Sequence, residues 1–250
     1  MSQSIPNSIA LVTGANRGIG KAIVEALLAR GATKVYAAAR NIASLADLTA
    51  AHGEKVVPVT LDVTNPSQIA AAAETAKDAT LVINNAGAAA NPDLFAEDLS
   101  AAQREFDVNY WGTLHMTRAF APQLKAAGAG SLVNVVSIAG LTNFPMFPTY
   151  SDSKAALHSL TVGTRHLLAG TGVDVIGVYP GPVETDMAKD LDMPKASTAD
   201  VATTILDGIE SGADEVFTDE MAQGFSGPYN AGHKALEFGT REMLAQAAEA

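Results

Sequence analysis

Short apolar runs alternate with longer segments of mixed polarity along most of the chain. The runs are nearly continuous and rich in valine, isoleucine, leucine and alanine, which is typical of strands buried on both faces of a sheet. The segments between them repeat their apolar residues at helical spacing. Strands are predicted at residues 8–13, 34–39, 55–61, 80–84, 132–136 and 174–179, and residues 214–219 form a possible last strand.

Helices are predicted between and after these strands, at residues 21–30, 42–51, 65–77, 100–127, 148–168, 198–210 and 234–248. Glycines at positions 224, 227 and 232 predict a loop before the last helix. Pro58 places the third strand at a sheet edge, because proline cannot donate a hydrogen bond to a neighbouring strand. The alternation, without a linker or a repeat, predicts one α/β domain over residues 1–250. We expect a doubly wound parallel sheet (Rossmann fold) of about seven strands, with helices on both faces.

The composition and charge of the chain narrow its possible partners. Apolar residues make up 48% of the 250 residues, and the net charge of −11 argues against nucleic acid and membrane as partners. The chain has no cysteine, which excludes disulfides and thiol catalysis, and its histidines show no metal-ligand spacing, so we expect no metal. Residues 1–7 do not have the character of a signal peptide, and no apolar run approaches the ~18 residues of a membrane span. We therefore expect a cytoplasmic protein.

One stretch carries candidate proton-transfer chemistry. It runs from Ser137, at the end of a predicted strand, to Tyr150 and Lys154 at the start of a predicted helix. Residues four apart lie on one helix face, so the phenol and the ammonium can enter the same pocket, and the loop can bring Ser137 to meet them. A neighbouring lysine favours the phenolate and is expected to lower the pKa of the phenol. A tyrosine tuned in this way is a general acid or base.

A glycine-rich turn joins the first predicted strand to the first predicted helix. Gly14, Gly18 and Gly20 follow the spacing Gly-x-x-x-Gly-x-Gly. Glycines allow the backbone to approach a ligand, and the helix N-terminus offers free N–H groups, so the turn predicts a pyrophosphate site. The alternative is a tight strand-to-helix turn that needs glycine for its own geometry.

Two arginines lie where the ribose of a dinucleotide is expected. The second strand ends at Ala39 and Arg40, without the acid that would hold the 2′-hydroxyl of NAD, and Arg17 lies within the glycine turn. Two guanidiniums suit a 2′-phosphate, so the pair favours NADP(H) over NAD. The alternative is that Arg17 and Arg40 are solvated residues at a helix start and a loop.

These motifs, taken in order, resemble the short-chain dehydrogenase/reductase family in its compact form. The resemblance covers roughly residues 8–186. Each motif alone arises by chance, but the ordered set is specific to the family. The motifs are Thr13–Gly20, Asp62, Asn84–Gly87, Asn109, Ser137, Tyr150 with Lys154, and Pro180–Val183 with Thr185.

The resemblance implies reduction of a ketone by NADPH, with the reverse alcohol oxidation. It assigns the proton to Tyr150, a hydrogen bond to the same substrate oxygen to Ser137, the nicotinamide ribose to Lys154, and a water of the proton relay to Asn109. Asp62 has a second interpretation, as an ordinary turn residue. With the arginines and the glycine turn, the predicted cofactor-binding residues are Gly14, Asn16, Arg17, Gly18, Ile19, Gly20, Arg40, Asp62, Val63, Asn85, Ala86, Gly87, Tyr150, Lys154, Pro180, Gly181, Val183 and Thr185.

Large apolar residues flank the predicted catalytic set. Phe144, Met146 and Phe147 precede Tyr150, while Met187 and Met193 fall in a segment, about 186–197, where the family carries a mobile lid. They predict a pocket for a hydrophobic or aromatic ketone, and the alternative is ordinary core packing.

The resemblance also bears on assembly and leaves other functions open. The family usually forms dimers or tetramers, so we expect a homo-oligomer, although a C-terminal extension at about 220–250 departs from many relatives. A 3-ketoacyl-type reductase is disfavoured by the lack of a basic cluster near the lid. A catalytically idle NADP-binding regulator or scaffold stays possible, as does dehydration or epimerisation with a retained cofactor.

Overall fold

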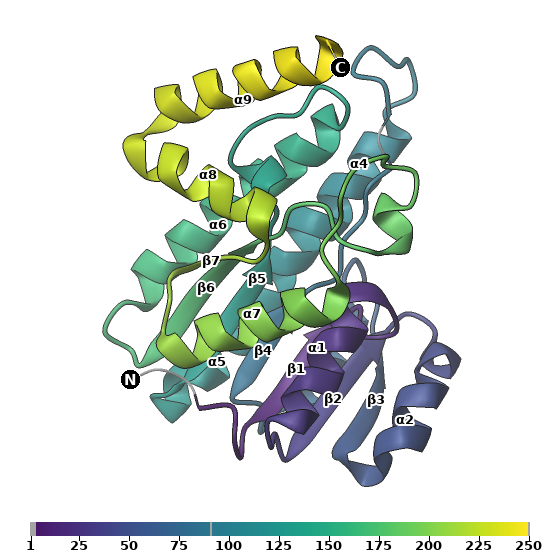
Figure 1. Cartoon of the computed structure of the whole chain (residues 1–250). Coiled ribbons are helices and arrows are strands. Elements are labelled where there is room, and N and C mark those ends of the chain that lie inside the picture. Colours follow the sequence, from purple (N-terminus) through teal and green to yellow (C-terminus); the bar gives the residue numbers. More distant parts are fainter. Residues whose placement is uncertain (1–3, 91, 250) are drawn as a thin grey trace.

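The structure is a computed structural model that describes residues 4–90 and 92–249. Residues 1–3, 91 and 250 lie outside this description, so the expectations for residues 1–7 and for the two domain ends fall partly beyond it. One parallel sheet, ordered β3-β2-β1-β4-β5-β6-β7, forms the centre of the molecule (Figure 1). Its strands are β1 (Ile9–Thr13), β2 (Lys34–Ala39), β3 (Val56–Thr60), β4 (Leu81–Asn84), β5 (Gly130–Val135), β6 (Val173–Tyr179) and β7 (Glu215–Phe217).

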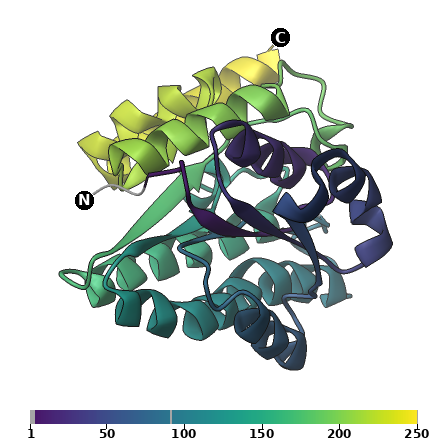
Figure 2. The ribbon, with the colours of Figure 1, turned by 90° about the horizontal axis from the view of Figure 1, so that it is seen from below.

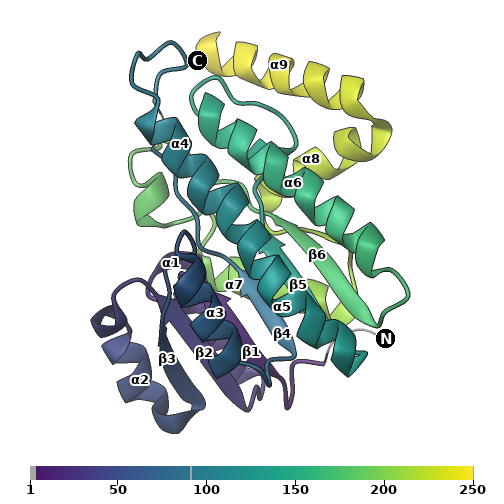
Figure 3. The same ribbon diagram turned by 180° about the vertical axis from the view of Figure 1, so that it is seen from behind.

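Helices form a layer on each side of the sheet (Figure 2). Figure 3 shows α3, α5 and α6 across one face, while α1 and α7 lie on the opposite face in Figure 1. The helices are α1 (Gly18–Ala29), α2 (Ala46–His52), α3 (Pro66–Thr75), α4 (Ser100–Phe106), α5 (Thr113–Ala127), α6 (Pro148–Leu168), α7 (Thr198–Ser211), α8 (Glu220–Ala231) and α9 (His233–Glu249). Among the described residues, no helix is both long enough and apolar enough to cross a bilayer.

Successive residues of β1 belong to different cores. Ala10 and Val12 pack in the cluster that includes residues of α1 and α7, and Leu11 packs in the cluster that includes Met116 and Phe120 of α5. A strand that is buried on both faces has no polar face, so its sequence is continuously apolar. The predicted doubly wound parallel fold is therefore confirmed.

The strand order reverses between β1 and β4. The chain builds β1, β2 and β3 toward one edge and then crosses to β4 on the other side of β1. The edge position predicted for β3 from Pro58 is confirmed. In open parallel sheets, ligands bind outside the carboxyl ends of the strands at such a reversal. Thr13 of β1 and Asn84 of β4 end their strands there.

Two predicted elements differ from the observed ones. The loop expected around Gly224 and Gly227 is wrong, because both residues lie inside α8. Asp219 caps this helix by accepting from the backbone N–H of Ala222, and burial of Phe225 offsets the low helix propensity of glycine, about 1 kcal/mol per residue. The long helix predicted at 100–127 is divided into α4 and α5 by a π-helical segment, Asp107–Gly112.

The predicted C-terminal extension forms α8 and α9, which cross the carboxyl end of the sheet (Figure 1). Phe225 of α8 packs edge-on against Phe144, with ring centroids 5.9 Å apart. Leu236 of α9 is buried in the same cluster. The extension therefore packs against the loop between β5 and α6, which carries part of the candidate site.

Candidate active site

The glycine turn between β1 and α1 is folded tightly against the end of β4. Gly14 and Gly18 have positive φ angles of 64° and 52°, a conformation that favours glycine. A Cβ on Gly20 would lie 2.2 Å from the carbonyl oxygen of Gly14, so a larger residue there cannot fit without displacement. The Thr13 hydroxyl accepts from the N–H groups of Asn85 and Ala86, each at 2.9 Å. These contacts fix the turn beside Asn85–Gly87, which are also predicted to bind the cofactor.

The residues at this turn fit a bound dinucleotide. No side chain in the described chain caps the N-terminus of α1, where Arg17 has an extended φ of −160°. The N–H groups there are available to a phosphate, and the helix dipole favours negative charge. A Cβ on Gly87 would lie 3.4 Å from Asn109 Oδ1 and 3.7 Å from Lys154 Nζ, so backbone without a side chain borders these two residues. Pyrophosphate and nicotinamide ribose are groups that such a surface can hold.

Four further residues predicted to bind the cofactor, Arg17, Arg40, Asp62 and Val63, have different surroundings. Arg17 Nη1 donates to Asp186 Oδ2 at 2.6 Å, and Arg40 is exposed just beyond β2. Asp62 Oδ1 accepts from both the N–H and the hydroxyl of Thr64, which is the turn geometry of the second interpretation. Val63 is buried. The cofactor roles of these residues stay predictions.

Ser137, Tyr150 and Lys154 meet at the carboxyl end of the sheet. Ser137 Oγ accepts from the N–H of Ala139 at 3.1 Å and donates to the carbonyl of Pro180 at 3.3 Å. Tyr150 and Lys154 share a face of α6, with Lys154 Nζ 5.7 Å from the centroid of the phenol ring. The spacing in the sequence thus brings all three side chains together, and their catalytic roles stay predictions.

Asn109 lies in the π-helical segment and is fully buried. Its Nδ2 donates to the carbonyl of Ala88 and to Ser153 Oγ, both at 2.9 Å. Its Oδ1 accepts from the N–H of Ala88 at 2.9 Å. The amide therefore ties the loop after β4 to α6 beside Lys154. The predicted role in a water relay stays a prediction.

Burial dominates the ionisation of Tyr150 and Lys154. It raises the pKa of Tyr150 to about 12, partly offset by a hydrogen bond with Ser137, while the charge of Glu105 raises this pKa further. Burial also lowers the pKa of Lys154 to about 7. The predicted lowering of the phenol pKa by Lys154 is therefore wrong. The physical reason is that the lysine itself loses charge on burial, and its Nζ donates to the carbonyl of Val135 at 2.9 Å.

Glu105 is a buried acid near the site that sequence reasoning missed. Its Oε1 accepts from the N–H of Ala90 at 2.7 Å, and its Oε2 accepts from the hydroxyl of Thr149 at 2.5 Å. Thr149 immediately precedes Tyr150, so Glu105 braces the start of α6. The available signal was its position four residues before Asn109, on the same face of one helical run.

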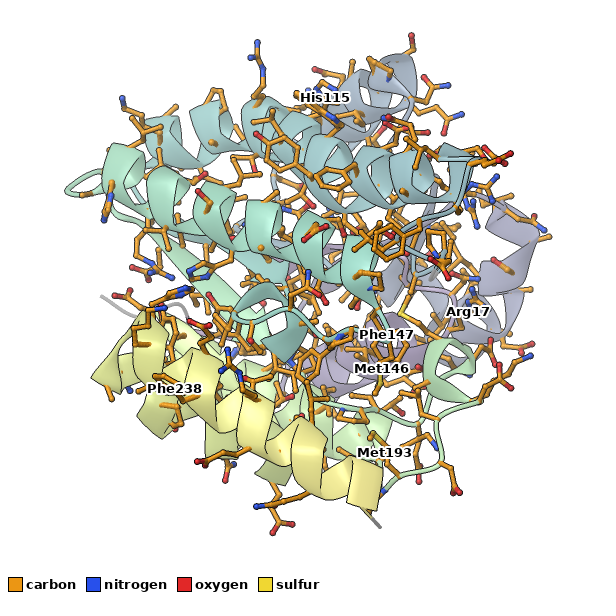
Figure 4. The ribbon with its side chains drawn as sticks, turned by 90° about the horizontal axis from the view of Figure 1, so that it is seen from above. Arg17, His115, Met146, Phe147, Met193 and Phe238 are labelled. Atoms are coloured by element: carbon orange, nitrogen blue, oxygen red, sulfur yellow. The ribbon has the colours of Figure 1, made fainter. Side chains whose placement is uncertain are left out.

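The predicted substrate residues divide into buried and exposed ones. Phe144 is only 8% exposed and packs on Phe225, so it belongs to the core and does not face an open pocket. Met146, Met187 and Met193 are 53%, 52% and 36% exposed. Figure 4 shows Met146, Phe147, Met193 and Arg17 in one half of the molecule, away from Phe238 of α9. Met146, Met187 and Met193 are thus open to solvent, and their role in a substrate pocket stays a prediction.

A hollow lies on one side of the loop between β5 and α6. It has a volume of about 540 Å³ and lies between residues 139–145, α6 and α9. None of the five predicted substrate residues lines it. It is therefore separate from the predicted substrate pocket.

The segment predicted as a lid begins and ends at paired backbone positions. Val183 bridges Ala196, the N–H of Glu184 donates to Ala196 O, and the N–H of Ala196 donates to Pro182 O, the last two bonds at 2.9 Å. A Cβ on Gly18 would lie 3.1 Å from Thr185 Cγ2, so Thr185 faces the glycine turn. The remaining predicted cofactor residues are Asn16 and Ile19, both partly buried in or beside the turn, and Pro180 and Gly181 directly after β6. Movement of the lid stays a prediction.

A family model described as short chain dehydrogenase matches residues 8–196. The chain belongs to the short-chain dehydrogenase family. Similarity to individual members extends over most of the chain. A solved short chain dehydrogenase from Burkholderia cenocepacia, in complex with NADP, is 45% identical with a TM-score of 0.87, and the match covers 94% of this chain and 97% of that one.

Two further members show the spread of the family. A short chain dehydrogenase/reductase from Burkholderia phymatum, in complex with NAD, is 28% identical with a TM-score of 0.81, and the match covers 89% of this chain and 92% of that one. The ketoacyl reductase HetN of Nostoc sp. is 32% identical over 223 residues, which is 84% of this chain and 78% of that protein. Family membership makes the present protein an oxidoreductase.

Proposed function

We propose that the protein is an NADPH-dependent carbonyl reductase that works reversibly as an alcohol dehydrogenase, on a hydrophobic or aromatic ketone. The observation that carries the proposal is the meeting of Ser137, Tyr150 and Lys154 beside a glycine turn that fits a dinucleotide. A protein that only binds a nucleotide does not need a phenol, a hydroxyl and an amine in one place. The exposed Met146, Met187 and Met193 support an apolar substrate.

The proposed cofactor is NADP(H). The glycine turn would hold the pyrophosphate, Arg17 and Arg40 the 2′-phosphate, and the backbone of 180–185 the nicotinamide end. When bound, the nicotinamide supplies a hydride to the substrate carbon. The NADP complex of the 45% identical relative supports this assignment more strongly than the NAD complex of the 28% identical one supports NAD.

The protein residues handle the proton. Burial raises the pKa of Tyr150 to about 12, so at neutral pH the phenol is protonated and can donate to the carbonyl oxygen of a ketone. The Ser137 hydroxyl would turn its one proton from the carbonyl of Pro180 to that same oxygen and stabilise the charge that develops on it. Because burial lowers the pKa of Lys154 to about 7, this amine exchanges protons near neutrality and can resupply the phenol.

The decisive experiment is a screen of NADPH oxidation over ketones graded from small aliphatic to bulky aromatic, with NADH in parallel. We expect turnover with apolar ketones and a preference for NADPH. Tyr150→Phe should lose nearly all turnover and keep NADPH binding, and retained turnover would contradict the role of the phenol. Ala39→Asp combined with Arg40→Ser should shift the preference toward NADH.

A second candidate, a 3-ketoacyl reductase, is favoured by the similarity to HetN. Acidic residues of the lid, including Asp186 and Asp190, oppose docking of an acidic acyl carrier. Acetoacetyl-CoA in the same screen separates the two candidates. Tight NADPH binding without any turnover would instead indicate a regulatory or scaffold protein, and product formation without net NADPH oxidation would indicate dehydration or epimerisation.

We further propose that the protein is cytoplasmic and forms a homo-oligomer. Trp111 and Leu167 support assembly because they are 46% and 82% exposed on the outer helices. Light scattering coupled to size-exclusion chromatography tests this directly. A monomer at micromolar concentration would contradict it.

A further inference from the structure

β6 and β7 end side by side, and the next residues of each strand stay in contact. Tyr179 pairs with Phe217 in the parallel register, so Gly181 and Asp219 each lie two residues beyond the same pair. The N–H of Gly181 donates to Asp219 Oδ2 at 2.8 Å. A Cβ on Gly181 would lie 2.5 Å from Asp219 Oδ1, so this approach depends on glycine.

Both oxygens of the Asp219 carboxylate are engaged from different sides. Oδ1 accepts from the N–H of Ala222 at 3.0 Å and caps α8, while Oδ2 also accepts from the hydroxyl of Thr218 at 2.9 Å. An asparagine has one acceptor oxygen and one donor nitrogen, so it can cap α8 or accept from Gly181, but it cannot do both. The arrangement therefore requires a carboxylate.

The peptide group that Asp219 holds also contacts the catalytic loop. Its N–H belongs to Gly181 and its carbonyl belongs to Pro180. That carbonyl accepts from the N–H of Ile138 at 3.1 Å and from Ser137 Oγ at 3.3 Å. One peptide unit is thus fixed at its N–H by α8 and at its oxygen by Ser137. A charged acceptor on the N–H polarises the peptide and strengthens its carbonyl as an acceptor.

We propose that Asp219 is a positioning residue that connects the C-terminal helices to Ser137 and to the nicotinamide end of the cofactor site. It acts through the 180–181 peptide and touches neither substrate nor cofactor. This inference rests on the proposed function, because it assigns the 180–185 backbone to the nicotinamide. Without this carboxylate, the peptide can rotate, and both Ser137 and the loop lose their fixed position.

Asp219→Ser separates the capping role from the positioning role. Serine is as good an N-cap as aspartate, but it is too short to also accept from Gly181. The dissociation constants of NADPH and of adenosine 2′,5′-bisphosphate are measured by fluorescence and calorimetry, together with kcat. We expect NADPH to bind about tenfold more weakly and kcat to fall about tenfold, as for loss of one hydrogen bond to a charged group. Binding of the bisphosphate, which has no nicotinamide, should be unchanged.

Glu220→Gln is the matched control, because it removes a charge from the next residue, which is exposed. It should match the unchanged protein in all three measurements. Gly181→Ala breaks the same contact from the other side. Combined with Asp219→Ser, it should cost little more than either change alone, since both remove one interaction.

The outcomes separate the two proposals. If the unchanged protein fails to bind NADPH, the proposed function is contradicted. If it binds NADPH and Asp219→Ser binds NADPH equally well, only the role of Asp219 is overturned. Equal weakening of NADPH and the bisphosphate also overturns that role, because it indicates general loss of structure. If Asp219→Ser does not fold, Asp219→Thr, which is also an N-cap and is also too short to reach Gly181, carries the same test.

Discussion

Arg17 and Asp186 form an ion pair, with Arg17 Nη1 2.6 Å from Asp186 Oδ2. Arg17 belongs to the glycine turn, and Asp186 begins the predicted lid. Both side chains are largely exposed, at 68% and 71%, so the pair contributes at most about 1 kcal/mol to stability. Its functional consequence is competition, because Arg17 is also proposed to bind the 2′-phosphate.

Asp186→Asn should therefore tighten NADPH binding by about two- to fivefold, the range that an exposed ion pair covers. The thermal midpoint should not change. Asp190→Asn removes another exposed lid carboxylate. It is the control for a general change in electrostatic potential and should have a smaller effect on NADPH binding. Equal gains from the two variants would show that Arg17 has no particular role in the competition.

Lys154 should reduce stability at neutral pH. The pKa of this amine falls from 10.5 to about 7 on folding, so between these values the unfolded chain binds a proton that the folded chain does not. Protonation of Lys154 in the unfolded chain therefore lowers the free energy of unfolding as pH falls from 10.5 toward 7, whereas above pH 10.5 there is no such loss. Lys154→Met should therefore be inactive but more stable than the unchanged protein at pH 7, with a gain that shrinks toward pH 10.

Chemical denaturation at several pH values tests this prediction. Lys189→Met removes an exposed lysine and should show no pH-dependent gain. If Lys154→Met were less stable than the unchanged protein at pH 7, the folded protein would have to stabilise the charged form of Lys154, which would contradict the prediction.

Glu105→Gln should change the pH dependence of turnover. The buried carboxylate raises the pKa of Tyr150, and glutamine keeps its size while removing its charge. Alcohol oxidation needs the phenolate, so its half-maximal rate should move to lower pH. Asp107→Asn is the control, since this acid bonds Gln103 at the surface. An unchanged profile would limit Glu105 to bracing Thr149.

Gly20→Ala should disrupt the glycine turn. Its Cβ would lie 2.2 Å from Gly14 O and 2.5 Å from Asn85 Nδ2, and forced packing of this kind costs about 1–3 kcal/mol. Gly163→Ala, in α6, meets nothing within 4 Å and should stabilise the protein by about 0.5–1 kcal/mol. Urea denaturation of both variants compares the two helical glycines, and a harmless Gly20→Ala would contradict the packing argument.

The order of strands and helices could be predicted because burial on both faces makes each parallel strand continuously apolar. Helix α8 could not be predicted from local pattern, since Gly224 and Gly227 weaken it. It forms because Asp219 caps its first turn and because Phe225 packs on Phe144, and only the second of these contacts joins distant parts of the chain. The π-helical segment leaves the apolar spacing close to that of an ordinary helix, so periodicity does not reveal it.

Within the candidate site, the relative placement of residues on one helix could be predicted from the sequence, whereas their burial and pKa values could not. The face shared by Tyr150 and Lys154 follows from helix geometry alone. Both pKa values depend on burial, and that of Tyr150 also depends on Glu105, which comes from another helix. Phe144 has the same apolar character on a pocket wall as in a core, and the position of Phe225 decides between them.

The π-helical segment at Asp107–Gly112 sets the relative phase of α4 and α5. On its N-terminal side, Glu105 bonds Thr149 of α6, and on its C-terminal side, Met116 and Phe120 fill the core under the sheet. Deleting one residue between them would turn the two halves by about 100° relative to each other. The number of residues in this stretch is thus constrained from both ends. Insertion or deletion of a single residue there would prevent Glu105 and the core residues Met116 and Phe120 from keeping their contacts at the same time.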